Sequence, residues 1–180
     1  MRLVKVFSLL SVMLLALAGC AQTGLGSHGS VSANNFIQAN YKAAENLQAQ
    51  LASRAAGNST LLVATLVNID ALDRSSTLGR LVSEQVSARF TQGGYRMIEM
   101  KFQNSVYMAR GQGELMLTRQ VHELANAYSA EAVIVGSYGT SKEYVLINLK
   151  VVEPATNQVL AVYDYSLPID ENVRMLLRNR

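Results

Sequence analysis

The cysteine at position 20 is the residue whose type and position most directly predict a chemical modification. It closes the tetrapeptide Leu17-Ala18-Gly19-Cys20, which has the pattern of a bacterial lipobox. A thiol at this point can accept a diacylglyceryl group. Cleavage between Gly19 and Cys20 then exposes an amino terminus that can also be acylated. The sequence therefore predicts a lipid anchor at Cys20 and signal cleavage at the Gly19–Cys20 bond.

The residues before the tetrapeptide have the organisation of a secretory signal. Arg2 and Lys5 give a basic start, and an apolar stretch from Val6 to Leu17 is interrupted only by two serines. That stretch is shorter than the roughly 20 apolar residues of a transmembrane helix. An ordinary secretory signal and an uncleaved signal anchor are the alternatives. The only cysteine of the chain lies at the cleavage point, which favours the lipoprotein signal.

Asp70 and Asp73 are the best candidates for a catalytic pair of carboxylates. A general acid and base would need a cleft that separates their two pKa values. Both residues precede a predicted helix, where aspartate is favoured by amide capping and by the helix dipole. We prefer this structural interpretation.

The other candidate sites lack essential partners. His122 and Glu123 are adjacent in a predicted helix, so they point about 100° apart and cannot share a metal ion. Gly111-Gln112-Gly113 precedes Glu114, whose charge is wrong for a phosphate loop, and 136–139 lacks the spacing of a nucleophile elbow. His28 has no neighbouring ligand. The sequence predicts a protein that is not an enzyme and has no catalytic residue, cofactor, metal site or identified small-molecule substrate.

Two groups of side chains are compatible with either a core or a docking surface. The methionines could form an adaptable contact surface, but such residues more often fill a core, and we prefer that interpretation. Tyr163 and Tyr165 share one face of the last predicted strand, where they could be part of a docking surface or be half-buried. The methionines concerned are Met97, Met100, Met108 and Met116.

The charge balance gives no indication of a nucleic-acid partner. The chain has 16 Lys and Arg against 13 Asp and Glu, and removing residues 1–19 takes away Arg2 and Lys5, leaving 14 against 13. No run of basic residues supplies the electrostatic footprint that nucleic acid needs. A single cysteine also allows no disulfide within the chain, so the fold must rest on its apolar core.

Composition divides the chain into three parts. Residues 1–19 form the signal, and 20–35 are rich in small polar residues and read as a lipidated flexible tether. Residues 36–180 have the length of one globular domain.

Periodicity predicts helices and strands in alternation. Apolar residues recur at helical spacing from Asn35, with Gly57 as the candidate cap. Further helices are predicted over Thr77–Gln92, with a cap at Ser75 or Ser76 and a stop at Gly93-Gly94, then from about Leu117 to Tyr128 and over Glu171–Leu177. The predicted strands cover Leu61–Val67, Tyr95–Met100, Ala132–Tyr138, Glu143–Val152 and Val159–Tyr165, with an extended piece near Asn104–Tyr107.

This order predicts an α/β (α+β) fold. Strand–helix–strand units imply parallel pairing, whereas the last two strands, joined around Glu153–Gln158, must form an antiparallel hairpin. A single mixed sheet with packed helices follows. Val145, Ile147 and Leu149 should share its buried side with Val151.

Several segments, taken in order, resemble the FlgO family of flagellar outer-membrane lipoproteins. They are Leu66–Ser76, Leu78–Gln85, Gly113–Leu117, Ala132–Tyr138, Val152–Asn157 and Tyr163–Pro168. The resemblance covers roughly Phe36 to the carboxyl terminus, with Thr77 where proline is expected and Asn157-Gln158 where Gly-Arg is usual. It implies a fold similar to the amino-terminal domain of TolB.

The resemblance also implies a function. We expect a non-catalytic assembly module of the flagellar envelope apparatus, bound to membrane lipid through Cys20 and contacting flagellar or other envelope proteins. A general envelope lipoprotein that docks a periplasmic secretion or cell-wall partner is the alternative. Ala21 follows the cysteine, and the absence of aspartate there favours the outer membrane, in either leaflet.

Overall fold

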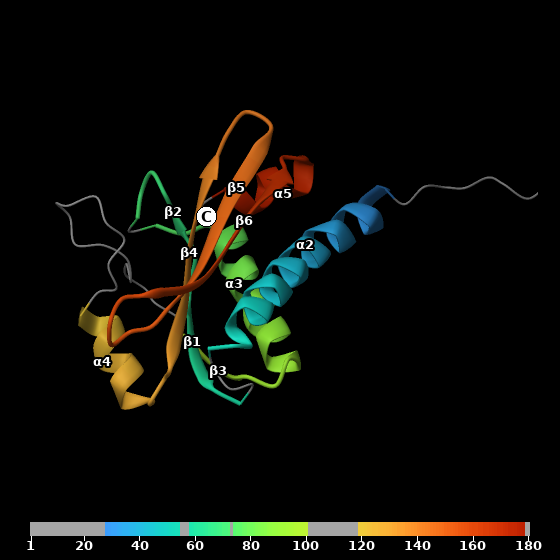
Figure 1. Cartoon of the computed structure of the whole chain (residues 1–180). Coiled ribbons are helices and arrows are strands. Elements are labelled where there is room, and N and C mark those ends of the chain that lie inside the picture. The colour runs from blue at the N-terminus through green and yellow to red at the C-terminus, as the bar shows by residue number, and fades with distance from the viewer. Residues whose placement is uncertain (1–27, 55–57, 73, 101–118, 179–180) are drawn as a thin grey trace, which may run out of the picture. The chain divides into compact units, whose positions relative to one another are not determined.

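A mixed sheet of six strands lies at the centre of the folded domain (Figure 1). The computed structural model describes residues 28–54, 58–72, 74–100 and 119–178. The strands are β1 (Thr60–Ala64), β2 (Val67–Asn68), β3 (Arg96–Met100), β4 (Ala132–Thr140), β5 (Tyr144–Val152) and β6 (Val159–Pro168). The helices are α2 (His28–Leu51), α3 (Thr77–Gln92), α4 (Arg119–Ala127) and α5 (Glu171–Leu177).

The strand order is β3-β1-β4-β5-β6, with β2 pairing with β4 beside this path. β1 is parallel to both β3 and β4, whereas β4, β5 and β6 are successively antiparallel. The predicted mixed sheet, its strand–helix–strand units and its terminal hairpin are therefore confirmed.

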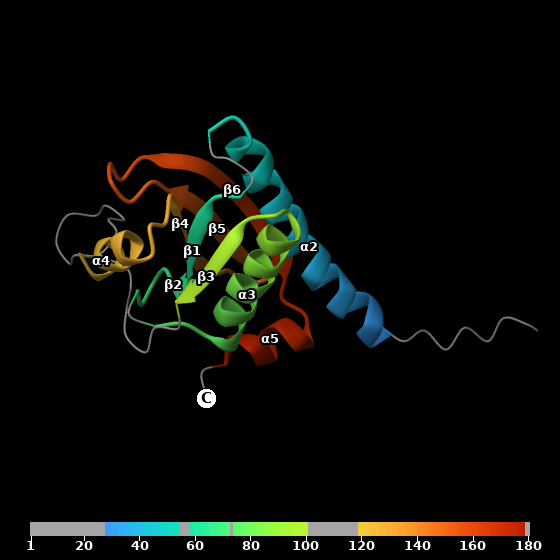
Figure 2. The same ribbon diagram turned by 90° about the horizontal axis from the view of Figure 1, so that it is seen from below.

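Helices cover the two faces of the sheet unequally (Figure 2). α2, α3 and α5 lie on one face, and a large buried cluster that includes Leu47, Phe90 and Leu149 fills the space beneath them. α4 lies on the other face and buries a smaller cluster around Val121, Ala125 and Val133. The main core thus lies on one side of the sheet.

The helix predicted over Thr77–Gln92 is confirmed at both ends. Ser76 is its N-cap, because its hydroxyl accepts a hydrogen bond from the Gly79 N–H. Gly93 ends the helix and Gly94 follows with a φ of 92°, a conformation that glycine adopts without strain. The apolar side chains Leu78, Val82, Val86 and Phe90 of this helix are buried, and Leu81 is half-buried.

The single strand predicted over Leu61–Val67 is wrong in one respect. Leu61–Ala64 is buried on both faces as expected, but β1 ends at Ala64 and pairing resumes only in β2. Two serine hydroxyls replace the ladder at Leu66: its N–H donates to Ser83 Oγ at 2.9 Å, and Ser75 Oγ donates to its C=O at 2.6 Å. Because these hydroxyls satisfy the backbone, the strand can break inside the core.

The boundaries of two other helices also differ from prediction. α2 begins at His28, not at Asn35, because an established helix gains one backbone bond for each residue that it adds. Part of the segment expected to be a flexible tether is therefore helical, and His28 belongs to the helix. The helix ends at Leu51, and the predicted cap Gly57 lies outside the described residues.

Tyr128, which was predicted to end the helix before β4, lies just outside α4. The helix ends at Ala127 and the chain turns at Ser129, which has a φ of 52°, so Tyr128 leaves the helical face and is 53% exposed. The hairpin and the closing helix Glu171–Leu177 agree with prediction. The extended piece near Asn104–Tyr107 lies outside the described residues.

Candidate docking surface

Strand β5 shows how differently the two faces of the sheet are used. Val145, Ile147 and Leu149 are buried under α2 and α3 together with Val151, which confirms the predicted face. Their neighbours Tyr144 and Leu146 point to the opposite face and are 46% and 57% exposed. α4 does not cover this part of the sheet, because the apolar cluster that it buries reaches β5 only at Val152.

Strand register groups these exposed side chains into one surface. Leu146 is paired with Gly139 on β4 and with Ser166 on β6, and Tyr144 is paired with Pro168. Ile69, 54% exposed, lies over Gly139: a Cβ on that glycine would come within 3.0 Å of Ile69 Cγ2. We call this surface the open sheet face, defined as Ile69, Gly139, Tyr144, Leu146, Asn148, Val162, Asp164, Ser166 and Pro168.

The open sheet face combines apolar and polar groups. Asn148 Nδ2 donates to Asp164 Oδ1 at 2.6 Å, so a polar pair lies between Leu146 and the 42% exposed Val162. Exposed apolar side chains bordered by polar groups are typical of protein contact sites. The arrangement suits the docking of another polypeptide.

The two strand tyrosines belong to the covered face instead. Tyr163 and Tyr165 are half-buried, pack against the main core and have ring centroids 6.1 Å apart. The Tyr165 hydroxyl donates to Asn40 Oδ1, and Asn40 Nδ2 donates to Gln85 Oε1 at 2.5 Å. Burial of the phenol, and secondarily the neighbouring Tyr163, raise the pKa of Tyr165 well above its usual range. These tyrosines join β6, α2 and α3.

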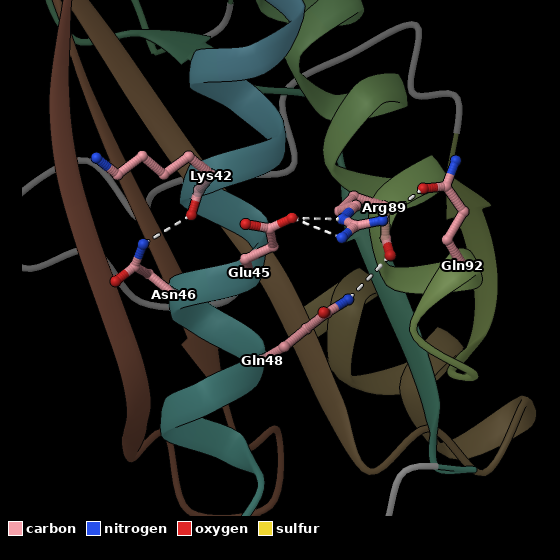
Figure 3. A network of polar contacts seen from close by, with 6 residues as sticks. All are labelled: Lys42, Glu45, Asn46, Gln48, Arg89 and Gln92. Atoms are coloured by element: carbon pink, nitrogen blue, oxygen red, sulfur yellow. Dashed lines mark hydrogen bonds and ion pairs between the residues drawn. The ribbon is translucent and has the colours of Figure 1, made fainter.

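A polar network also joins α2 to α3 on the surface (Figure 3). Arg89 donates from Nε and Nη2 to Glu45 Oε1 at 3.0 and 2.5 Å, and Gln48 Nε2 donates to the Arg89 carbonyl at 3.0 Å. The guanidinium also lies 5.9 Å from the centre of the Tyr41 ring. These contacts hold α2 against α3, and the exposed groups involved are structural.

The segments that carry the family resemblance meet inside the domain. A Cβ on Gly79 would lie 2.6 Å from the Leu66 carbonyl and 2.9 Å from the Tyr138 ring, and one on Gly136 would lie 2.9 Å from Leu66 Cγ. Three resemblance segments thus pack around Leu66. Within Ser75–Arg80 only Arg80 is exposed. The buried residues of these motifs specify the fold, whereas Ile69 and the outward residues of Tyr163–Pro168 also contribute to the open sheet face.

The catalytic and metal candidates do not form a site in the part of the chain that the structure describes. Asp70 is exposed and its N–H bonds to Asn68 Oδ1; Ser76, not Asp70, caps α3, which corrects the expected capping role. His122 is half-buried on α4. Among described residues no group of three His, Cys, Asp or Glu could hold a metal ion.

The remaining candidates divide into two groups. Met97 packs partly buried against the main core, as preferred. Gly19, Cys20, Asp73, 111–114, Met108 and Met116 lie outside the described residues, and so does the side chain of Met100. Within the described ranges, no helix combines the length and apolar character needed to cross a membrane.

The sequence also contained an indication of the open sheet face. Tyr144 and Leu146 occupy the alternate positions of β5 that should be polar if that side faced water. Two large apolar residues there indicate a second contact surface. Ile69 gave no such indication, because its place over Gly139 depends on the pairing of β2 with β4.

Comparison with protein families decides where this chain belongs. The model of the family described as "FlgO protein" matches residues 41–172, which is most of the chain. The chain belongs to the FlgO family. Membership confirms the resemblance stated above and supports the expectation of an envelope lipoprotein. No curated protein sequence matches the chain.

Two solved structures share the fold of this FlgO-family chain. The C-terminal domain of LpoB from Salmonella enterica is 14% identical, with a TM-score of 0.52, and the match covers 69% of this chain and 94% of that domain. The corresponding Escherichia coli domain is 13% identical, with a TM-score of 0.50 and coverage of 71% and 97%. At this identity the likeness shows a common fold.

Proposed function

We propose that this FlgO-family protein is an outer-membrane lipoprotein, anchored through Cys20, that serves as a non-catalytic assembly module of the flagellar envelope apparatus. The observation that carries the proposal is the family match over residues 41–172. The lipobox at Leu17–Cys20 supports the anchor, and Ala21 supports the outer membrane. The open sheet face supports a role in protein contact.

The anchor determines what the domain can do. One acyl chain holds a protein at a membrane only marginally, whereas two or more give stable attachment. A triacylated Cys20 would therefore keep the domain at the membrane, where its docking surface meets envelope proteins in two dimensions. The protein's role is then to hold an envelope component in place.

Deletion of the gene tests the flagellar part of the proposal. We expect reduced swimming in soft agar and flagella that are lost or unstable by electron microscopy, with both restored by the wild-type gene. Normal motility and normal flagella in the deletion strain would contradict the flagellar role. A partner of another envelope process, identified by crosslinking through Leu146, would then favour the general docking lipoprotein.

The variant Cys20→Ser tests the anchor separately. Without the thiol we expect an unprocessed precursor, no incorporation of labelled palmitate and loss of the protein from the outer-membrane fraction. Because Cys20 precedes the folded domain, the purified variant should keep the wild-type circular dichroism spectrum. Continued lipid labelling of Cys20→Ser would refute the assignment.

A further inference from the structure

Strand β6 forms one edge of the sheet, and its outward backbone groups can be identified. In an antiparallel pair, alternate residues direct N–H and C=O either to the partner strand or away from it. Val162 directs both groups away from β5, since both bond to Gln50 of α2, whereas Ile169 N–H bonds to Glu143 C=O across the hairpin. Because the register between these two points is regular, the backbone N–H and C=O groups of Asp164 and Ser166 also point away from β5.

Two side chains, Gln50 of α2 and Arg54 just beyond its end, close the first half of this edge. Gln50 Nε2 donates to the Val162 carbonyl at 2.9 Å, and the Val162 N–H donates to Gln50 Oε1 at 3.2 Å. The carboxamide thus makes both bonds that a neighbouring strand would make. Arg54 Nη1 donates to the Leu160 carbonyl at 2.7 Å. We call Gln50 and Arg54 the edge clamp.

The clamp stops halfway along β6. Lys42 and Asn46 continue the same series at a spacing of four, and Figure 3 shows them on the side of α2 away from Glu45 and Gln48. Asn46 Nδ2 bonds to the Lys42 carbonyl instead of to the strand. Among the described residues, none bonds to the outward backbone groups of Asp164 and Ser166, which we call the edge window.

Both ends of the edge window are closed. Gln50 occupies the backbone of Val162 at one end, and Pro168, which has no N–H, lies at the other. Two residues with four free groups remain. Native proteins usually protect an exposed strand edge against pairing with other chains. Here protection covers Leu160 and Val162 and leaves the part that borders Leu146 and Pro168 open.

We propose that the edge window binds a short extended segment of an envelope protein, which adds to the sheet beside β6; this inference rests on the proposed docking function. Free N–H and C=O groups at strand spacing are complementary to an extended backbone. The backbone N–H and C=O of Asp164 would bond to one residue of the segment, and those of Ser166 to a second. These two segment residues would lie two positions apart.

The edge clamp argues against a second copy of the chain as the occupant. In an antiparallel pair of β6 strands centred on the window, Val162 of one copy would face Pro168 of the other. Gln50 already occupies that position beside Val162. A short segment that ends or turns at the clamp has no such conflict.

Side chains beside the window define the chemistry of the segment. The residue opposite Ser166 would lie next to a small side chain with the 57% exposed Leu146 beyond it, so an apolar residue fits there. The residue opposite Asp164 would meet an exposed carboxylate, so a basic residue fits there. An antiparallel segment then has the pattern apolar–any–basic.

The variant Ser166→Pro tests the inference at one backbone atom. Proline removes an N–H that points to solvent and leaves the β5–β6 ladder intact, as proline on an outer edge usually does. The probe is the fluorescein-labelled peptide Thr-Thr-Val-Thr-Lys-Thr-Thr, added to full-length lipoprotein purified in detergent. We expect saturable binding that Ser166→Pro weakens at least tenfold, while the matched control Ser166→Ala binds like wild type.

Two further measurements make the test specific to strand addition. The peptide should slow amide exchange in 163–167 of the wild-type protein, and the same peptide N-methylated at its valine and lysine should not bind. Replacing the clamp (Gln50→Ala with Arg54→Ala) should extend the slowed exchange to Val162, whereas Lys42→Ala with Asn46→Ala should leave it at the window.

No peptide binding, or equal binding by the folded Ser166→Pro and Ser166→Ala variants, would overturn the inference. If Ser166→Pro has an altered circular dichroism spectrum, the variant Asp164→Pro replaces it, because the backbone N–H of Asp164 also points outward. These outcomes are independent of motility. The edge inference can therefore fail while the flagellar role stands, and normal motility of the deletion strain leaves a peptide result unaffected.

Discussion

The covered face and the open face of the sheet differ at two leucines of one strand. Leu149 is completely buried in the main core, whereas Leu146, three positions earlier, is 57% exposed on the open sheet face. The residue type and the backbone are the same, and only the helices on each side differ. Leucine on the covered face is therefore expected to stabilise the domain, and leucine on the open face is available for contact with another protein.

The largest expected difference is between two truncations in β5. Leu149→Ala leaves a cavity in a close-packed core and should lower the free energy of unfolding by about 2–5 kcal/mol. Leu146→Ala removes exposed atoms and should change it by less than about 0.5 kcal/mol. Urea unfolding followed by circular dichroism measures both. Equal losses would show that the open face is packed in solution.

The buried polar contact on the covered face comes next in size. Asn40→Leu removes the acceptor of the Tyr165 hydroxyl and the donor to Gln85, and it should destabilise the domain by about 1–3 kcal/mol. Tyr165→Phe deletes the hydroxyl alone. The double variant should lose less than the sum of the two single losses, because both changes remove one shared bond. Strict additivity would contradict the contact.

Alkaline pH should lower the stability of the domain through a residue of the covered face, Tyr165. The folded-state pKa of Tyr165 lies above the ordinary value of 10.0, mainly because burial disfavours the phenolate. The contribution of the neutral phenol to stability is therefore complete below pH 10 and declines as the pH rises above it. Urea unfolding between pH 8 and pH 11 should show this decline, and Tyr165→Phe should reduce it. Burial also raises the pKa of Tyr95, so this residue should contribute a decline of the same sign.

The smallest expected effect concerns the ion pair on the rim of the covered face. The side chains of Arg89 and Glu45 are 34% and 49% exposed, so solvent screens their attraction. Glu45→Gln should cost only about 0.2–1 kcal/mol, and less in 1 M NaCl than at low salt. Asn46→Ala on the other side of α2 is the control. A loss as large as that of Asn40→Leu would contradict the expectation that solvent screens this ion pair.

Local pattern was sufficient where an element depends on its own residues. The helix Thr77–Gln92 was predicted at both ends, because Ser76 and Gly93 lie next to the amides and carbonyls that they satisfy. The buried side of β5 followed from its alternation. The break after Ala64 did not follow, because the hydroxyls of Ser75 and Ser83 that replace the ladder come from a later segment.

The candidate site followed from sequence only in part. Cys20 can be predicted from residues within one short segment, since the modification depends on local pattern, and it stays a prediction. The open sheet face depends on Ile69, Leu146 and Ser166, which are distant in sequence and become neighbours only through strand register. Tyr163 and Tyr165 were compatible with docking until α2 was found to cover them.

The sequence by itself determined the helix and strand alternation, the mixed sheet, the family and the predicted anchor, because each depends on the order of nearby residues. Only the tertiary structure decided that the other side of β5 stays exposed, and where along β6 the backbone is closed. Those outcomes depend on where α2 and α4 lie on the sheet. That placement is set by long-range contacts such as Gln50 with Val162 and Asn40 with Tyr165, and no local pattern contains them.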